Sequence, residues 1–496
     1  MTDPHAALLR QTAAGTAWIV GWRVASRLLG LASTLVLVRL LAPADFGLVA
    51  LAVSFAQAIE GFAWLDVEDA VVREKAPGRS VYDTGFTLNV LRGLLTAGAI
   101  ALLAWPAGHA FAEPRLVPIV LALAAVTAVD GFLNIGIVDF RRDFAFDREF
   151  RLWILPRLAG VAVTVGVAAA SGSYWALVAG IVTQRCLKVV ASYRMHPYRP
   201  RFSLSAWGVL GRYSLWTWVL GLLTLLRDRA DTLVLGRMLG TGPVGVFALA
   251  AEIAALPTTE LVEPMCRAAF SGFARGRNEA LTPAETWRRM IETTAVATLP
   301  AGVGISLLAA AVVRLGFGPA WLAAVLPMQA LALAGTVTVF GYVSATLFRT
   351  HGLMRPTAGI LGAAFVLRVG LLLALTAWHG LAGAAVGVAA AIVLEQGSYV
   401  AQACRRFGIP LRVLAGAVWR SLVATAAMAA VLVGAGLGWR DTGAPWAQLF
   451  GGAALGAGVY GAVLLGLWVA CGRPDGGERQ LLALAGSALR RVLKRA

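Results

Sequence analysis

The amino-acid sequence is dominated by long apolar runs that alternate with short polar connections. A helix needs about 20 predominantly apolar residues to cross roughly 30 Å of hydrocarbon. Fourteen stretches meet this requirement, at residues 14–40, 46–65, 84–106, 116–138, 152–171, 174–193, 213–237, 243–266, 292–314, 321–347, 356–378, 380–403, 414–437 and 446–470. Only His379 and Gly380 separate two of them, so twelve spans is the alternative count. The pattern predicts an all-α integral membrane protein.

One segment of the chain occurs twice. Residues Thr34 to Ala52 (TLVLVRLLAPADFGLVALA) recur at Thr232 to Ala250 (TLVLGRMLGTGPVGVFALA), with 10 of 19 positions identical at a constant offset of 198. Each copy reads as a helix end, an arginine, a turn containing glycine and a second helix. Since six predicted spans separate the copies, both enter the membrane in the same sense. This is typical of parallel repeats with a substrate site between them near mid-bilayer.

The repeat divides the chain into predicted domains. Residues 1–205 form a first six-helix bundle, residues 206–407 form a second, and residues 408–471 add two spans. Residues 472–496 form a basic cytoplasmic tail in which leucines stand among arginines. Such a tail suits either a helix on an anionic membrane surface or a solvated extension.

Positive charge is concentrated on alternate connections. The composition is 59% hydrophobic and 14% charged, the mean hydropathy is +0.75, and 43 Lys and Arg stand against 26 Asp and Glu. In a membrane protein, basic loops orient the chain with that side in the cytoplasm. The outer loops hold only Arg115 and Arg440, whereas the inner connections hold Arg73, Lys75, Arg79, Arg141, Arg142, Arg148, Arg151, Arg194, Arg199, Arg201, Arg212, Arg275, Arg277, Arg288, Arg289, Arg349, Arg355, Arg405, Arg406 and Arg412. Both termini are therefore expected in the cytoplasm.

The connections are too short for several classes of protein. Enzymes that polymerise or transfer sugars outside the membrane usually need a sizeable external loop, and every outer connection here is short. The sequence contains no GxxxxGK[ST] phosphate-binding loop and no metal-ligand spacing. We therefore expect no catalytic residues, no metal and no cofactor, and a transport cycle driven by an ion gradient or by the substrate gradient.

Arginines lie inside the first predicted span, where a charge at the helix centre costs roughly 2.5–3.5 kcal/mol on insertion scales. Arg23 and Arg27 are four residues apart and share one helix face. We expect both to face inward and to bind an anionic head group, because the guanidinium fork matches phosphate. The alternative is that each pairs with a neighbouring acid.

The seventh and eleventh spans supply further basic candidates. Arg227 and Asp231 are four residues apart and can neutralise each other, whereas Arg229 has no such explanation. Arg368 lies in mid-span and is another inward candidate. A further set lies closer to the cytoplasmic ends, where long side chains either snorkel or reach substrate: Arg92, Arg157, Arg185 and Lys188.

Four acids are expected inside the membrane: Glu60, Asp130, Glu252 and Glu395. Such carboxylates are candidates for proton or sodium coupling, because burial makes their protonation sensitive to conformation. The alternative is a static ion pair with one of the arginines. Glu252 is the first candidate, since it follows the repeat on the second helix of the second half, and Glu60 and Glu395 come next.

The end of the first span resembles a known family. LVLVRLLAPADFGLVALA, with Arg39 before Leu-Leu-Ala-Pro and Phe46-Gly47 opening the next helix, is similar to the start of Wzx-type polysaccharide and O-antigen flippases of the multidrug/oligosaccharidyl-lipid/polysaccharide (MOP) exporter superfamily. The stretch from Asp231 to Phe247 is similar to that family's seventh-helix ending. The resemblance implies two six-helix bundles forming a V-shaped cavity, with alternating access. It also implies cationic cavity residues for a diphosphate, here Arg23, Arg27, Arg229 and Arg368.

The function implied by the resemblance is that of a lipid-linked oligosaccharide flippase. It would carry polyprenyl-diphosphate-linked sugars from the cytoplasmic to the outer leaflet of a bacterial inner membrane, for exopolysaccharide, capsule or O-antigen assembly, beside glycosyltransferase and polymerase partners and without nucleic acid. Three alternatives stay open. A multidrug exporter on the same fold should carry more acids than arginines at mid-membrane, a membrane glycosyltransferase or polymerase should have an external loop, and a lipid II flippase differs only in substrate.

Overall fold

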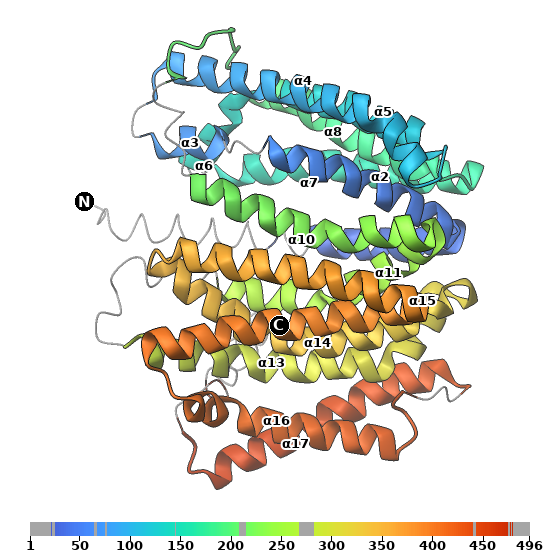
Figure 1. The fold of residues 1–496 in the computed structure, drawn as a ribbon, viewed down its shortest axis with the longest axis vertical. Helices are drawn as coiled ribbons and strands as arrows, with labels where there is room; N and C mark the ends of the chain where they lie inside the picture. Colours follow the sequence, from blue (N-terminus) through green and yellow to red (C-terminus); the bar gives the residue numbers. More distant parts are fainter. Residues whose placement is uncertain are drawn as a thin grey trace, which may run out of the picture. The chain divides into compact units, whose positions relative to one another are not determined.

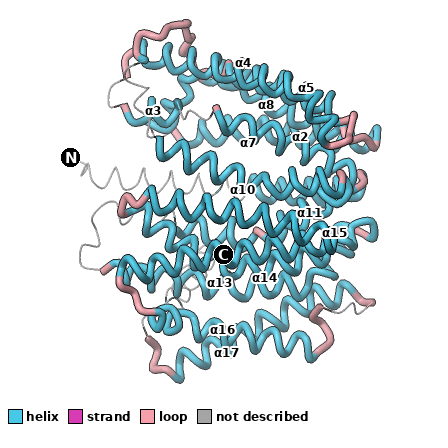
Figure 2. Tube along the Cα trace, viewed as in Figure 1, coloured by secondary structure: helices cyan, strands magenta, loops and turns pink. Residues whose placement is uncertain are grey.

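The computed structural model describes residues 21, 25–63, 67–74, 77–143, 145–207, 215–266, 282–439, 443–474, 477 and 479. Arg23 and the predicted tail beyond residue 479 lie outside these ranges. Within them the chain is helical and contains no β-strand, and Figure 2 shows loops only as connections between helices. The all-α architecture expected from the apolar runs is confirmed.

Most of the predicted spans correspond to long apolar helices. Among the described residues, nine helices are long and apolar enough to cross a membrane, or eleven if each of two bent pairs is one span. One of the nine, α15 (Met354–Phe407), covers two predicted spans and contains a break at Gly380, where φ is 55°. That left-handed φ favours glycine, so His379-Gly380 does separate two helical arms. The count of fourteen stays a prediction.

The chain divides into two compact units, Met1–Gly245 and Val246–Ala496. The first contains a helix at residues 25–40, called helix one below. The helices that follow in this unit are α2 (Pro43–Phe62), α3 (Val67–Arg73), α4 (Arg79–Ala110), α5 (Leu116–Gly131), the 3₁₀ helix η1 (Ile135–Val138), α6 (Asp139–Arg142), α7 (Phe146–Ser171), α8 (Trp175–Met195) and α10 (Leu215–Leu239). Within the unit, α4 packs on α5, α7 on α8, and α2 on both α5 and α10 (Figure 1).

The second unit begins inside α11 (Thr241–Ala254). It continues with η2 (Thr258–Val262), α13 (Pro283–Val312), η3 (Val313–Phe317), η4 (Pro319–Ala324), α14 (Val325–Thr350), α15, α16 (Leu411–Gly434), η5 (Ala447–Gly451) and α17 (Gly452–Ala470). Helix α14 packs on α13 and α15, and the pair α16 and α17 joins this group through α13. The core between α13 and α14 is built from large apolar side chains, including the fully buried Trp287.

Two predicted spans are bent rather than straight. Helix α5 ends at Gly131, and the segment Ile135–Arg142 leaves it at an angle of 71°, so the helix predicted at 116–138 is broken after Gly131. Asn134 caps this segment, because its side chain accepts a hydrogen bond from the Gly136 amide at 2.9 Å. The second bent pair, α11 and Thr258–Cys266, turns by 41°. Apolar content alone does not reveal either bend.

The two copies of the repeat meet through their equivalent glycines. A Cβ atom on Gly47 would lie 1.7 Å from the backbone oxygen of Thr241, and a Cβ atom on Gly245 would lie 2.0 Å from the backbone oxygen of Pro43. The offset of 198 relates Gly47 to Gly245 and Pro43 to Thr241, so each contact is the counterpart of the other. Both lie within the first unit. The start of α2 and the start of α11 therefore touch backbone to backbone, which only glycine permits.

Candidate functional site

Arg27 lies on one face of helix one with two small residues. It is half-buried, Ser26 is only 9% exposed, and Gly30 follows one turn later. The guanidinium of Arg157, from α7, lies against this face, since its Nη2 atom is 3.0 Å from the position that a Cβ on Gly30 would take. Arg157 was expected either to snorkel or to reach substrate, and the structure places its guanidinium against helix one.

Helix α10 carries a row of charges in its middle. Arg227 donates from Nε and Nη2 to the Asp228 carboxylate at 3.0 and 2.8 Å. Arg229 is half-buried, its Nε atom is buried, and it makes no hydrogen bond or ion pair with the part of the chain that the structure describes. A cation without a counterion inside an apolar helix is costly, so Arg229 remains the stronger candidate ligand on this helix.

A charged cluster joins three helices of the first unit. Arg185 Nη1, on α8, is 3.4 Å from Glu60 Oε1 on α2 and 3.2 Å from Asp130 Oδ2 on α5. Thr127 donates its hydroxyl to Glu60 Oε1 at 2.8 Å. The second Asp130 oxygen, Oδ1, is buried and accepts no hydrogen bond from the described residues. Glu60 and Asp130 therefore both pair with Arg185, which joins α8 to α2 and α5.

The cluster continues toward the expected cytoplasmic side of the unit. The Lys188 ammonium lies 4.2 Å from the centre of the Trp153 ring, a cation–π contact between α8 and α7. Beyond it, Arg141 on α6 pairs with Glu149 at 2.8 Å and with Glu68 at 3.9 Å. Arg141 therefore links α6 to α7 and α3 through acidic side chains.

The candidates of the second unit lie on separate helices or helix arms. Glu252 is half-buried on α11, Arg368 is half-buried on the first arm of α15, and Glu395 is 4% exposed on the second arm. Beside Glu395, the Gln396 Oε1 atom is 1.9 Å from the position that a Cβ on Gly341 would take, so α14 and α15 approach closely there. This close packing explains why Glu395 is so deeply buried.

The segment at residues 196–207, which follows α8, is fixed to the start of α4. The Asp83 carboxylate accepts hydrogen bonds from the Tyr198 hydroxyl and, at 2.8 Å, from the Arg201 amide. One residue further on, the Thr84 hydroxyl accepts from the Ala206 amide at 3.1 Å. This attachment could not be predicted from the sequence pattern, because it depends on long-range hydrogen bonds rather than on periodicity.

Two groups of this segment have shifted pKa values. Burial lowers the pKa of the His196 imidazole, and the Asp139 carboxylate, 3.3 Å away, opposes that shift. Burial and the hydrogen bond to Asp83 raise the pKa of the Tyr198 phenol. The first shift favours the neutral imidazole of His196, and the second keeps the Tyr198 phenol protonated as a hydrogen-bond donor.

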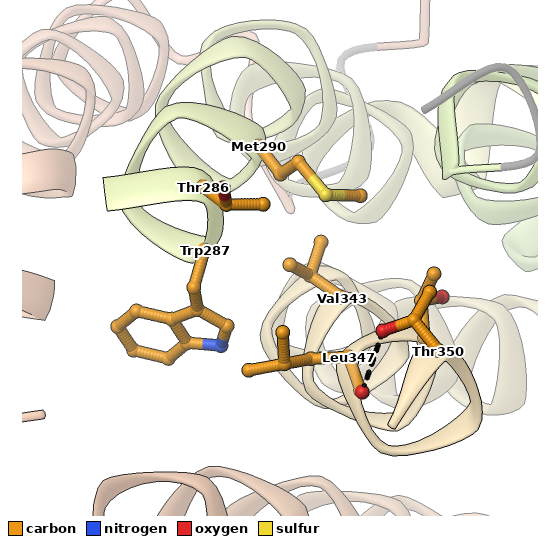
Figure 3. Close-up of a pocket in the computed structure, with 7 residues that line it drawn as sticks. Thr286, Trp287, Met290, Val343, Leu347 and Thr350 are labelled. Carbon is orange, nitrogen blue, oxygen red and sulfur yellow. Dashed lines mark hydrogen bonds between the residues drawn. The ribbon is translucent and has the colours of Figure 1, made fainter. Parts of the chain in front are cut away.

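A small apolar cavity lies between α13 and α14 in the second unit. Its lining includes Trp287 and Met290 on α13 and Val343 and Leu347 on α14, which point toward one another in Figure 3. The volume is ≈ 10 Å³, room for about one water molecule. Trp287 Nε1 donates to Ser344 Oγ at 2.9 Å and closes one side. A lipid head group does not fit here, so this cavity is not a substrate site.

Within the first unit, the described residues bring basic and acidic side chains of different helices into contact. Among them, no three His, Cys, Asp or Glu side chains are grouped to hold a metal ion. Sequence reasoning missed the position of Arg157 on helix one and the contact of Asp130 with Arg185. The only signal for the first was Gly30, one turn beyond Arg27. The second depends on which faces of α5 and α8 oppose each other.

A family model matches more than half of the chain. Residues 36–326 match the family described as polysaccharide biosynthesis protein. The chain belongs to this family. That finding confirms the resemblance expected from the end of helix one.

Two relatives of this polysaccharide biosynthesis family extend the comparison. The chain is 24% identical over 344 residues to the Escherichia coli (strain K12) lipopolysaccharide biosynthesis protein WzxC, covering 67% of this chain and 69% of that protein. It is 22% identical over 314 residues to the Rhizobium meliloti (strain 1021) succinoglycan biosynthesis transport protein ExoT. That match covers 61% of this chain and 62% of ExoT. The match to ExoT therefore spans less than two thirds of that protein's length.

Solved structures share the fold of this family member. The lipid II flippase MurJ, in an inward closed conformation, matches with a TM-score of 0.70 at 12% identity, over 92% of this chain and 99% of that one. An inward-facing multidrug resistance MATE family transporter of the MOP superfamily matches with a TM-score of 0.59 at 16% identity. The match covers 77% of this chain and 94% of the transporter. The chain is thus a multi-pass membrane protein with the MOP transporter fold.

Proposed function

We propose that this protein is a flippase for polyprenyl-diphosphate-linked oligosaccharides. It moves them from the cytoplasmic to the outer leaflet of a bacterial inner membrane, with both of its termini in the cytoplasm. The names of the relatives, which concern lipopolysaccharide and succinoglycan, support a role in exopolysaccharide, capsule or O-antigen assembly. The protein performs no chemical catalysis, and the glycosyltransferases and polymerase of the same assembly route are its partners.

This proposal rests chiefly on the position of Arg229 in the middle of α10, where it has no counterion in the described part of the chain. Such a charge is retained against a cost of roughly 2.5–3.5 kcal/mol when it has a ligand to bind. Together with Arg27, Arg23 and Arg368 it supplies guanidinium groups for a diphosphate, which accepts paired hydrogen bonds.

Coupling to an ion gradient is assigned to the intramembrane acids. Glu252 and Glu395 are candidates in the second unit, and Glu60 is the candidate in the first. Glu60 shares the Arg185 guanidinium with Asp130. Binding of a proton to one of these carboxylates would leave Arg185 paired with the other, so the two ion pairs offer a way to change partners during a transport cycle. This supports Glu60 as a coupling residue together with Asp130.

The test is transport by the purified protein in liposomes. A fluorescent polyprenyl-diphosphate-linked oligosaccharide is placed in one leaflet, and its arrival in the other is measured with a membrane-impermeant quencher. Replacing Arg27 or Arg229 by Ala should slow transport about tenfold or more, the loss of one charge-assisted bond. Arg115→Ala, which removes a cation paired with Glu113 outside the spans, is the control.

The outcomes of this assay separate the alternative functions. Equal rates of movement of the labelled lipid in liposomes with and without the protein would refute the proposed flippase function. Preferred transport of lipid II would identify a lipid II flippase, and export of cationic dyes instead would identify a multidrug exporter. Orientation is tested separately: a reporter fused after Arg201 should be cytoplasmic and one near Gly240 external.

A further inference from the structure

The inward face of helix one is defined by the spacing of its residues. Ser26 and Gly30 are four residues apart and Arg27 and Gly30 are three apart, so all three lie on neighbouring positions of one face. Further along, Leu37 of the same helix and Leu41, just after its end, belong to one core cluster with Ala168 of α7. Helix one and α7 therefore run side by side within the first unit.

Arg157 enters this face because Gly30 has no side chain. Its Nη2 atom is 3.0 Å from the position that a Gly30 Cβ would take, closer than an ordinary van der Waals contact. Ser26, one turn before Gly30 on the same face, is nine-tenths buried, and its hydroxyl makes no hydrogen bond with the described residues. A buried hydroxyl with no acceptor or donor is uncommon and calls for a missing partner.

The charges on this face have the same sign. Arg27 and Arg157 bring two guanidinium groups to helix one and α7, which pack against each other. An anion placed between them is attracted to both, and that attraction is strong in a medium of low dielectric. A group with several acceptor oxygens also satisfies the Ser26 hydroxyl. A diphosphate has that chemistry.

We propose that Arg157 and Ser26 form, with Arg27, the part of the first unit that binds the diphosphate of the lipid-linked substrate. This assignment rests on the flippase function proposed above and adds α7 to the substrate site. Gly30 is the positioning residue, because it admits the Arg157 guanidinium to the face that carries Arg27.

The test is binding to the purified full-length protein in detergent. Probes are a polyprenyl diphosphate and the uncharged polyprenol of the same length. Arg157→Ala should weaken diphosphate binding roughly 10- to 100-fold, and Ser26→Ala should weaken it by about three- to tenfold, without changing polyprenol binding. Arg157→Lys should restore part of the affinity, since the charge is kept and the fork is lost. The control is Arg151→Ala on the same helix, where the arginine is exposed.

Gly30→Ala separates a binding role from a structural one. Its Cβ displaces the end of the Arg157 side chain by a few tenths of an ångström, so affinity for the diphosphate should fall about threefold in the wild-type background. In the Arg157→Ala background the same change should have no effect. Gly21→Ala, where nothing lies within 4 Å, is the matched control.

Three results decide the question. Loss of diphosphate affinity in Arg157→Ala with an unchanged melting temperature, and coupling of Gly30 to Arg157, supports the site. Diphosphate binding by the Arg157 variants as tight as that of Arg151→Ala overturns it while leaving the flippase intact. A wild-type protein that does not distinguish the diphosphate from polyprenol refutes the flippase, and this site with it.

Discussion

The contact between Gly47 and Thr241 predicts a large effect of a single methyl group. Gly47→Ala places a Cβ 1.7 Å from a backbone oxygen, where contacts under 3.0 Å essentially never occur, so the two backbones must separate by about 1.3 Å. A side chain can rotate away from such a clash, but a carbonyl fixed in a helix cannot. Overpacking typically lowers the free energy of unfolding by roughly 1–3 kcal/mol. Because the carbonyl cannot move, we expect Gly47→Ala to lie at the upper end, about 3 kcal/mol.

The assay is thermal unfolding of the purified protein in one detergent. Gly47→Ala and its counterpart Gly245→Ala should each lower the melting temperature, and by similar amounts because the two contacts are counterparts in the repeat. Gly242→Ala is the control on α11, since nothing lies within 4 Å of its Cβ position, and it should be neutral or slightly stabilising. The double variant should lower the melting temperature by less than the sum of the two single changes, because one separation of the two backbones relieves both clashes. If Gly47→Ala melts at the same temperature as Gly242→Ala, the backbone contact is refuted.

Three further predictions concern charged and titratable groups. Arg229→Ala should slow flipping about tenfold while raising the melting temperature, measured in liposomes and in detergent respectively; a lower melting temperature would identify a structural charge. Glu60→Gln and Asp130→Asn should each reduce transport driven by an imposed proton gradient without reducing diphosphate binding, and undiminished gradient-driven transport in both would remove this pair from coupling. Because the pKa of His196 is lowered in the folded state, the unfolded state binds more protons, so stability should fall as the pH decreases below about 6.5. Part of that loss should vanish in His196→Gln and persist in His351→Gln, and identical melting curves against pH in the two variants would contradict the assignment.

The main features of the fold follow from short-range patterns in the sequence. Apolar runs of sufficient length locate the helices, and the repeat locates the equivalent turns before Gly47 and Gly245, which the structure brings into contact. The bend after Gly131 and the attachment of residues 196–207 to Asp83 were not predictable in this way. Both depend on polar groups that find partners far along the chain, and hydropathy averages over such groups.

The candidate site was predicted less completely for the same reason. The cost of a mid-membrane charge directs attention to Arg27 and Arg229, because each residue can be judged from its own helix. Whether a charge is paired depends on the opposing helix faces. Arg185 looks like a snorkelling residue in the sequence, yet α2 and α5 bring two carboxylates to it. Arg157 looks similar, and a glycine on helix one gives it an inward position.

The contrast between Arg185 and Arg229 separates scaffold charges from ligand-binding charges. Removing Arg185 leaves Glu60 and Asp130 without their shared cation, and breaking a buried pair costs 3–5 kcal/mol; partial exposure puts this case at the lower end, about 3 kcal/mol. Removing Arg229 leaves no acid behind in the described part of the chain and relieves the cost of a charge in an apolar helix. Arg185→Ala should therefore lower both stability and flipping, whereas Arg229→Ala should lower flipping alone. A residue that opposes stability persists when it serves function, so opposite shifts in melting temperature would assign Arg229 to the substrate and Arg185 to the scaffold.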